Sequence, residues 1–176
     1  LWTVNYPASG QLDYDNTPRA TPLIHDGRVY LFGAFGHLTC AELATGKIVW
    51  QLNVLQLFDG DPELVWGTCS SPLVVDGTLG GVRQIVGYDR STLGGWDPTT
   101  GDRLWTLKPP HHGDFNVPTP VAVDGRLFVA TENNGARLYE FDREGRIVPQ
   151  PVAELRPGAR ASSAAASRMP TACAIA

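Results

Sequence analysis

Three carboxylates lie close together in the sequence and could supply oxygen ligands to a calcium ion. Asp59, Asp61 and Glu63 alternate with other residues shortly before Trp66, and calcium is bound in proteins by such hard oxygen ligands. The remaining positions of a calcium-binding loop are absent, and an acidic turn exposed to solvent explains the spacing better. We therefore predict no metal site in this stretch.

Two adjacent histidines, His111 and His112, form a second candidate metal patch together with Asp114. Imidazole and carboxylate groups are suitable ligands for transition metals, but neighbouring side chains of an extended chain point to opposite sides. An exposed loop is the favoured interpretation. The sequence also shows no Ser-His-Asp arrangement, phosphate-binding glycine loop or pair of catalytic carboxylates, so we assign no catalytic residue.

The composition argues against several classes of function. The net charge is -4 and the 14 Lys and Arg residues are scattered without runs, so no basic face for nucleic acid is expected. No apolar stretch approaches the roughly 18 residues of a membrane-spanning helix. Cys40, Cys69 and Cys173 have neither zinc-ligand spacing nor the even number of a disulfide framework.

An internal repeat organises the chain. A Ser/Thr-Pro pair, an apolar run and an Asp-Gly pair recur with the proline at positions 22, 72 and 120, which are 50 and 48 residues apart. A glycine turn and a tryptophan follow in the first two units, whereas Pro149 takes the place of tryptophan in the third. Trp2 lies 48 residues before Trp50, which indicates the last strand of a preceding unit.

Each unit predicts four short antiparallel strands. Proline can begin a strand, and Asp-Gly suits a two-residue hairpin turn. Units of this length with four strands have the size of a β-propeller blade, whereas a two-sheet sandwich gives no reason for the period. We therefore predict an all-β partial propeller over residues 1–155. Its three blades are expected at residues 18–52, 68–107 and 117–149, and residues 78–81 are expected to lengthen the first hairpin of the second unit.

The end of the sequence departs from this pattern. Residues 156–176 are rich in Ala and Ser and contain no acidic residue, which predicts a disordered tail. An arc of three blades leaves the faces of its end blades uncovered, so we expect the isolated chain to associate with itself through them.

The repeat resembles that of the pyrroloquinoline-quinone (PQQ)-type family, which includes quinoprotein alcohol dehydrogenases and the outer-membrane-assembly lipoprotein scaffold. The matching residues are Pro22, Asp26-Gly27, Glu42, Gly46 and Trp50 in the first unit, and Pro72, Asp76-Gly77, Asp97, Gly101 and Trp105 in the second. The resemblance implies a ring of seven or eight blades and a periplasmic or extracellular location. It also implies that Trp50 and Trp105 dock blades together at glycine turns such as those of Gly46 and Gly101.

Two functions stay open at this point. The first is a non-catalytic scaffold or binding module, for which no cofactor is expected, and it is favoured because the repeat is intact while catalytic motifs are absent. The alternative is a fragment of a quinone-dependent dehydrogenase, with PQQ and calcium bound by blades that are missing here.

Propellers bind ligands where the connections enter their innermost strands. We therefore expect a protein or small-molecule partner at these connections. Their candidate ligand-binding residues are Arg19, Trp66, Cys69, His111, His112 and Asn116.

Overall fold

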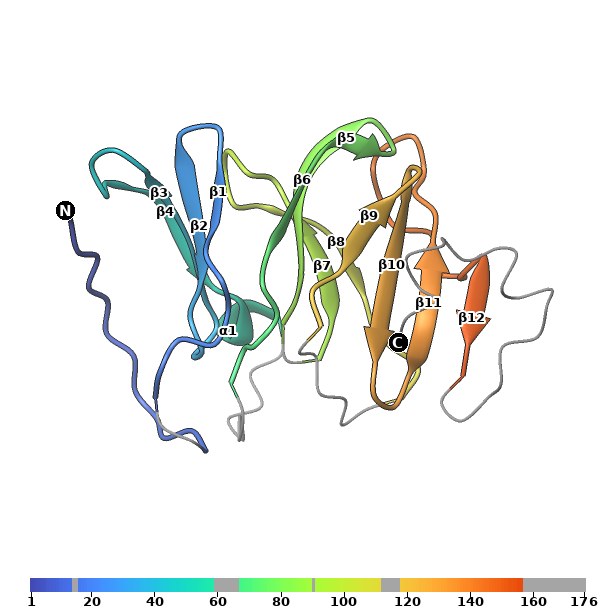
Figure 1. The fold of residues 1–176 in the computed structure, drawn as a ribbon, viewed down its shortest axis with the longest axis horizontal. Coiled ribbons are helices and arrows are strands. Elements are labelled where there is room, and N and C mark those ends of the chain that lie inside the picture. The colour runs from blue at the N-terminus through green and yellow to red at the C-terminus, as the bar shows by residue number, and fades with distance from the viewer. Residues whose placement is uncertain (14–15, 59–66, 90, 112–117, 157–176) are drawn as a thin grey trace.

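The computed structural model describes residues 1–13, 16–58, 67–89, 91–111 and 118–156. Its strands form three four-stranded antiparallel sheets that follow one another along the chain, each with its strands paired in sequence order (Figure 1). We call these sheets the first, second and third blade. The predicted all-β fold of three four-stranded units is confirmed.

The strands have the following bounds. The first blade consists of β1 (Leu23–His25), β2 (Arg28–Phe32), β3 (His37–Glu42) and β4 (Ile48–Asn53), and is followed by the short helix α1 (Val54–Phe58). The second blade consists of β5 (Leu73–Leu79), β6 (Val82–Tyr88), β7 (Leu93–Trp96) and β8 (Arg103–Leu107). The third blade consists of β9 (Val121–Val123), β10 (Arg126–Thr131), β11 (Gly135–Tyr139) and β12 (Ala153–Leu155). None of the described helices is long and apolar enough to span a membrane.

The first hairpins of the first and third blades turn at their Asp-Gly pairs. Asp26 and Gly27 have φ angles of 52° and 70°, and Asp124 and Gly125 have φ angles of 48° and 73°. Positive φ at both central residues produces the turn whose twist matches two antiparallel strands. The local sequence therefore sets the geometry of both hairpins.

The first hairpin of the second blade is longer. β5 continues through Asp76 and Gly77 to Leu79, and the chain turns at Gly80 and Gly81, whose φ angles are 61° and 76°. The pairing register shifts between Val75 and Leu79. Residues 78–81 thus lengthen this hairpin, as the spacing of the repeat predicts.

The last strand of the third blade lies beyond residue 149, where the sequence placed the end of this unit. Ile147 pairs with Phe141, but the chain then leaves the sheet and returns at β12, where Ala153 pairs with Leu138. Pro149 and Pro151 explain this excursion, because proline has no N–H to donate to a strand partner.

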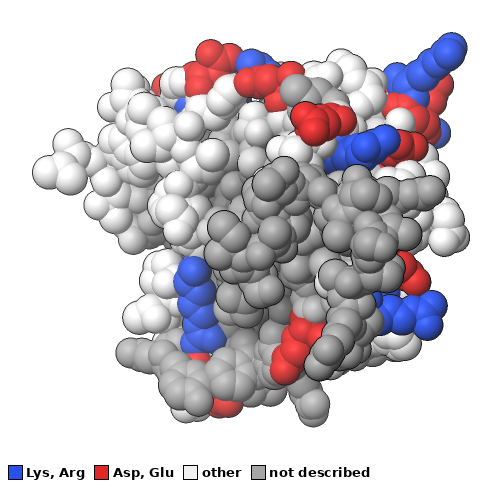
Figure 2. All heavy atoms as spheres, turned by 45° about the vertical axis from the view of Figure 1, so that its right-hand side comes forward, with Lys and Arg blue, Asp and Glu red and all other residues white. Residues whose placement is uncertain are grey.

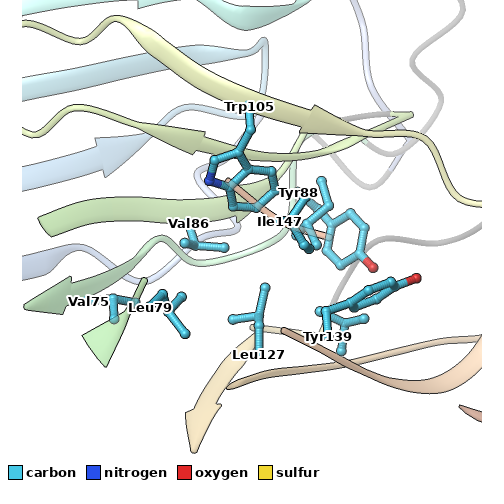
Figure 3. Close-up of a cluster of buried hydrophobic side chains, with 10 residues drawn as sticks. Val75, Leu79, Val86, Tyr88, Trp105, Leu127, Tyr139 and Ile147 are labelled. Carbon is cyan, nitrogen blue, oxygen red and sulfur yellow. The ribbon is translucent and has the colours of Figure 1, made fainter. Parts of the chain in front are cut away.

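Two clusters of buried apolar side chains fill the spaces between blades. One joins the first blade, through residues such as Tyr30 and Phe32, to Ile85 and Trp96 of the second. The other joins Val86 and Trp105 of the second blade to Leu127 and Tyr139 of the third (Figure 3). β5, the first strand of its blade, contacts both β1 and β9, so the three first strands adjoin as the innermost strands of a propeller do.

Residues 1–6 run beside the first blade without forming a strand of its sheet (Figure 1). Trp2, Val4 and Tyr6 are half-buried, whereas the residues between them are exposed. This alternation is typical of a strand with one face against a protein surface. The segment therefore lies on the first blade much as an outer strand of a preceding blade would.

Candidate functional site

Tryptophan side chains join blades at glycine turns. Trp50 of β4 donates its indole N–H to the carbonyl oxygen of Pro98 at 3.0 Å, in the turn that leads to β8. A Cβ atom at Gly101 of that turn, where φ is 82°, would lie 2.9 Å from the ring of Trp50. The close approach and the positive φ together require glycine at this position.

The same contact is made one blade earlier. Trp2 donates its indole N–H to the carbonyl oxygen of Leu43 at 2.8 Å, and its ring lies against Gly46, where φ is 74°. The segment that carries Trp2 therefore lies against the first blade in the same way that β4 lies against the second blade.

Trp105 joins the second blade to the third by a different arrangement. Its indole N–H donates to Oε1 of Gln84 at 2.5 Å, and Nε2 of Gln84 donates to the carbonyl oxygen of Gly145 at 3.1 Å. Val82, from the lengthened β5–β6 hairpin, lies against Gly145 in the way that an indole lies against Gly46. Trp105 is consequently set deeper and is only 7% exposed, beside Val86 and Ile147 (Figure 3).

A buried ion pair lies on the face of the second blade that meets the first. Nη2 of Arg103 is 3.3 Å from Oδ2 of Asp89 and donates to the hydroxyl of Thr92 at 2.9 Å. The guanidinium also lies 4.2 Å from the ring centre of Trp96, a cation–π contact. Burial lowers the pKa of Arg103, and the charge of Asp89 opposes that shift. The guanidinium rests on Gly94, where a Cβ atom would collide with it.

An exposed group of charged residues links the first hairpins of the first two blades. Nε of Arg83 lies 2.5 Å from Oδ1 of Asp76, and its Nη1 lies 3.1 Å from Oδ2 of Asp26. Nε2 of His25 is 3.1 Å from the other oxygen of Asp76. These hydrogen bonds raise the pKa of Arg83. Acidic and basic side chains gather along the upper edge of the surface in Figure 2, the end at which these hairpins lie in Figure 1.

The described ends of the connections that enter the innermost strands lie at the other end of the blades. Asn134, only 3% exposed, accepts a hydrogen bond from the N–H of His111 and donates one to its carbonyl, each at 3.0 Å. This pair of bonds fixes the main chain of His111 against the third blade, while the residue itself is exposed. The arrangement presents an imidazole at the end where a ligand is expected.

A hydrogen bond from the N–H of Thr21 to the hydroxyl of Ser71, at 2.9 Å, joins the described ends of the connections that enter β1 and β5. Arg19 lies in the first of these connections and donates to the carbonyl of Asp13. Cys69 lies in the second, with Sγ 3.6 Å from the carbonyl oxygen of Gly67. The structure thus brings the segments of Arg19 and Cys69 together. Trp66, His112 and Asn116 lie outside the described residues, as do the acidic residues 59, 61 and 63.

His37 forms a further aromatic contact on the first blade. Its ring centre lies 4.5 Å from that of Tyr6, at an interplanar angle of 34°, and its buried Nδ1 has no hydrogen-bond partner. Burial lowers the pKa of His37. The neutral imidazole therefore forms part of the surface that holds residues 1–6.

A PQQ-like repeat model, described as outer membrane protein assembly factor BamB, matches residues 1–108 and again residues 66–173. The chain belongs to this PQQ-like repeat family. No curated protein sequence matches it.

Solved structures show the same fold as this PQQ-like repeat chain. BamB from Moraxella catarrhalis matches 85% of the chain at 20% identity with a TM-score of 0.56, and the match covers 42% of that structure. A quinohemoprotein alcohol dehydrogenase from Comamonas testosteroni matches 82% of the chain at 18% identity with a TM-score of 0.56, covering 28% of its structure. A second such dehydrogenase, from Pseudomonas putida HK5, gives 19% identity and a TM-score of 0.51 over 78% of the chain and 21% of its own. The chain therefore spans less than half of each.

Several interactions between strands and blades of this PQQ-like repeat chain are not indicated by any motif in its sequence. The polar residues involved have partners on other strands or other blades, and their spacing in the sequence forms no recognisable motif. These residues are Gln84, Asp89, Arg103 and Arg83. One signal was present, since Gly94-Gly95 interrupts an otherwise apolar strand. Glycine inside a strand marks the close approach of another group, here Arg103 at Gly94 and Trp105 at Gly95.

Proposed function

We propose that the chain is part of a non-catalytic propeller that acts as a scaffold or binding module. The observation that supports this proposal is that its buried polar side chains connect neighbouring blades. Gln84 joins Trp105 to the third blade, and the guanidinium of Arg103 lies against Trp96, an indole in the apolar cluster shared with the first blade. In the described part of the chain these groups hold blades together.

The alternative, a quinone-dependent dehydrogenase, requires calcium beside the cofactor. Asp89 is a buried carboxylate of the described chain, and a calcium ligand would need a free oxygen lone pair. One of its oxygens accepts from the N–H groups of Ser91 and Thr92, and the other from the hydroxyl of Thr92 and from Arg103. Asp89 therefore does not fit a calcium site, and the calcium of this alternative would have to be bound by blades that are missing here.

The partner that we propose is a protein bound at the strand-entering connections. His111, Arg19 and Cys69 lie at this end, and His111 is rigidly held by Asn134. The matching family model is described as an assembly factor for outer membrane proteins, which supports a protein partner and a location outside the cytoplasm. The fold itself hosts many functions, so the site has to be tested directly.

Two measurements test the proposal. In the first, the full-length protein that contains these blades is titrated with PQQ in the presence of calcium while tryptophan fluorescence and dye-linked alcohol oxidation are followed. We expect neither saturable quenching nor activity. Stoichiometric binding of PQQ with dye reduction would establish the dehydrogenase alternative instead.

In the second measurement, a photo-crosslinking amino acid replaces His111 in one variant and Asp124 in a matched control. Asp124 is exposed and lies in the hairpin at the opposite end of the third blade. After irradiation in the source cells, we expect a discrete protein adduct at position 111 and none at position 124. Adducts at both positions, or at neither, would contradict a binding face at the connections.

A further inference from the structure

Three buried polar atoms at the boundary between the first and second blades lack a hydrogen-bond partner in the described part of the chain. They are the hydroxyl oxygens of Thr68 and Ser70 and the indole nitrogen of Trp96. Thr68 is 2% exposed, and Ser70 and Trp96 are wholly buried. Buried polar groups of folded proteins are almost always hydrogen-bonded. These three atoms therefore require a partner outside the described residues.

Thr68 and Ser70 lie on the buried side of the connection that enters β5. Along this connection half-buried residues alternate with buried ones, and the buried ones are Thr68, Ser70 and Pro72. Alternate side chains of an extended chain point to opposite sides, so the two hydroxyls share one side with Pro72. The hydroxyl of Ser71, on the other side, accepts the N–H of Thr21.

This connection contacts both the first and the second blade. The N–H of Thr68 donates to a carbonyl oxygen in the turn between β2 and β3, at 2.8 Å. A Cβ atom on Gly87 of β6 would lie within 4.0 Å of both Pro72 and the ring of Trp96. That ring makes an edge contact with Phe32 of the first blade, with the ring centres 6.4 Å apart. The two hydroxyls and the indole N–H therefore belong to one boundary between blades.

Trp96 differs from the other tryptophans that the structure describes. Trp2, Trp50 and Trp105 each donate the indole N–H to an oxygen atom of the protein, at distances of 2.8, 3.0 and 2.5 Å. An indole N–H is only a donor, whereas a hydroxyl can both donate and accept. A partner that satisfies both kinds of group has to accept hydrogen bonds as well as donate them.

The charges beside Trp96 favour a neutral partner. The guanidinium of Arg103 lies 4.2 Å from the ring centre of Trp96 and is paired with Asp89 at 3.3 Å, so its charge is already matched and attracts no further anion. Water is neutral, donates and accepts, and in protein interiors makes about three hydrogen bonds to polar groups that lack other partners.

We propose that the boundary between the first and second blades is a binding site for ordered water, held by the hydroxyls of Thr68 and Ser70 and by the indole N–H of Trp96. The connection that carries Cys69 is then fixed through water on its buried side and through Ser71 on its exposed side. The boundary between the second and third blades is joined directly instead, by the side chain of Gln84.

A high-resolution crystal structure of the protein tests the site directly. We expect a water oxygen about 2.5–3.2 Å from each of Thr68 Oγ1, Ser70 Oγ and Trp96 Nε1. Hydrogen bonds from these atoms to protein groups in place of water, or a dry boundary, would overturn the proposal.

Removal of one hydroxyl gives an independent measurement, because the sign of the effect differs between the two cases. Thr68→Val keeps the shape of the side chain. If the hydroxyl binds water, this variant should lower the midpoint of urea unfolding. If the hydroxyl has no partner at all, the variant should raise the midpoint, because an unsatisfied buried group is lost.

Thr39→Val is the matched control for this measurement. Thr39 is 1% exposed, and its hydroxyl accepts from Nε2 of Gln51 at 2.7 Å, so this variant shows the loss expected for a satisfied buried hydroxyl. Thr68→Val should lower the midpoint comparably, and Ser70→Ala should act in the same direction through a smaller change of the side chain. An unchanged or raised midpoint in both Thr68→Val and Ser70→Ala would overturn the proposal.

Discussion

The indole N–H of Trp105 and the side-chain oxygen of Gln84 form a buried hydrogen bond across the second blade. Through the other end of its carboxamide, Gln84 also reaches the turn of the third blade at Gly145. A contact that Trp50 makes directly with the next blade is here made through an intermediate side chain. Gln84 is wholly buried, so both of its polar ends matter for stability.

Replacement of Gln84 by leucine should destabilise the protein strongly. The indole N–H of Trp105 and the carbonyl of Gly145 would both lose a buried partner, and each unsatisfied group costs about 1–3 kcal/mol. We expect a loss of about 3 kcal/mol in the free energy of unfolding, measured by urea denaturation. Trp105→Phe removes the indole N–H, so the double variant should lose less than the sum of the single losses. Strict additivity would show that the two side chains are not coupled.

The direct contact of Trp50 can be divided into its hydrogen bond and its ring. Trp50→Phe keeps an aromatic ring against Gly101 but removes the N–H bonded to Pro98, and should lose about 1 kcal/mol. Trp50→Ala removes both and should lose about 3 kcal/mol. The two variants are compared by denaturant midpoints. Equal losses would mean that ring packing contributes nothing to the contact between the blades.

Two glycines of the second blade should differ in their tolerance of replacement by alanine. At Gly94 a Cβ atom would collide with the guanidinium of Arg103, which is held in place by Asp89 and Trp96. At Gly87 the nearest atoms lie at 3.9 Å, an ordinary contact distance. Gly94→Ala should therefore lower the free energy of unfolding by about 2 kcal/mol or more, whereas Gly87→Ala should leave it within about 0.5 kcal/mol. A tolerated Gly94→Ala would show that the ion pair can move aside.

The contact between Tyr6 and His37 should weaken in acid. Burial lowers the pKa of His37 from 6.5, so the released or unfolded state takes up a proton at a higher pH than the docked state does. Its contribution to stability is therefore complete above about pH 6.5 and declines as the pH falls through that value. Thermal unfolding followed between about pH 7.5 and about pH 5.5 should show the decline. His37→Gln should flatten it, and an unchanged slope in that variant would assign the effect to another group.

The parts of the fold that the sequence predicts are those set by neighbouring residues. Asp26-Gly27 and Asp124-Gly125 form tight hairpins because few other pairs accept positive φ at both positions. The outer strand of the third blade was misplaced, since the register of a strand depends on a partner elsewhere. Ala153, and not Pro149, holds the position of the missing tryptophan.

The candidate site was predicted less well for the same reason. The sequence predicts ligand binding at the connections that enter the innermost strands, which stays a prediction, and the hydrogen bond from Thr21 to Ser71 joins the described ends of two of them. It gave no indication that Gln84 would meet Gly145, 61 residues away. Such a contact depends on how two blades are set against each other, and no local pattern in the chain encodes that.

The exposed pair of Arg83 with Asp26 should make the two blade boundaries respond differently to salt. Mobile ions screen exposed charges and leave a buried, neutral hydrogen bond nearly unaffected. The boundary between the first and second blades carries the pair of Arg83 with Asp26, whereas the one between the second and third carries Gln84. Raising the ionic strength should therefore speed amide hydrogen exchange in the first blade while the other two exchange as before. The arc of blades thus has one boundary between blades that dissolved salt can weaken and one that it cannot.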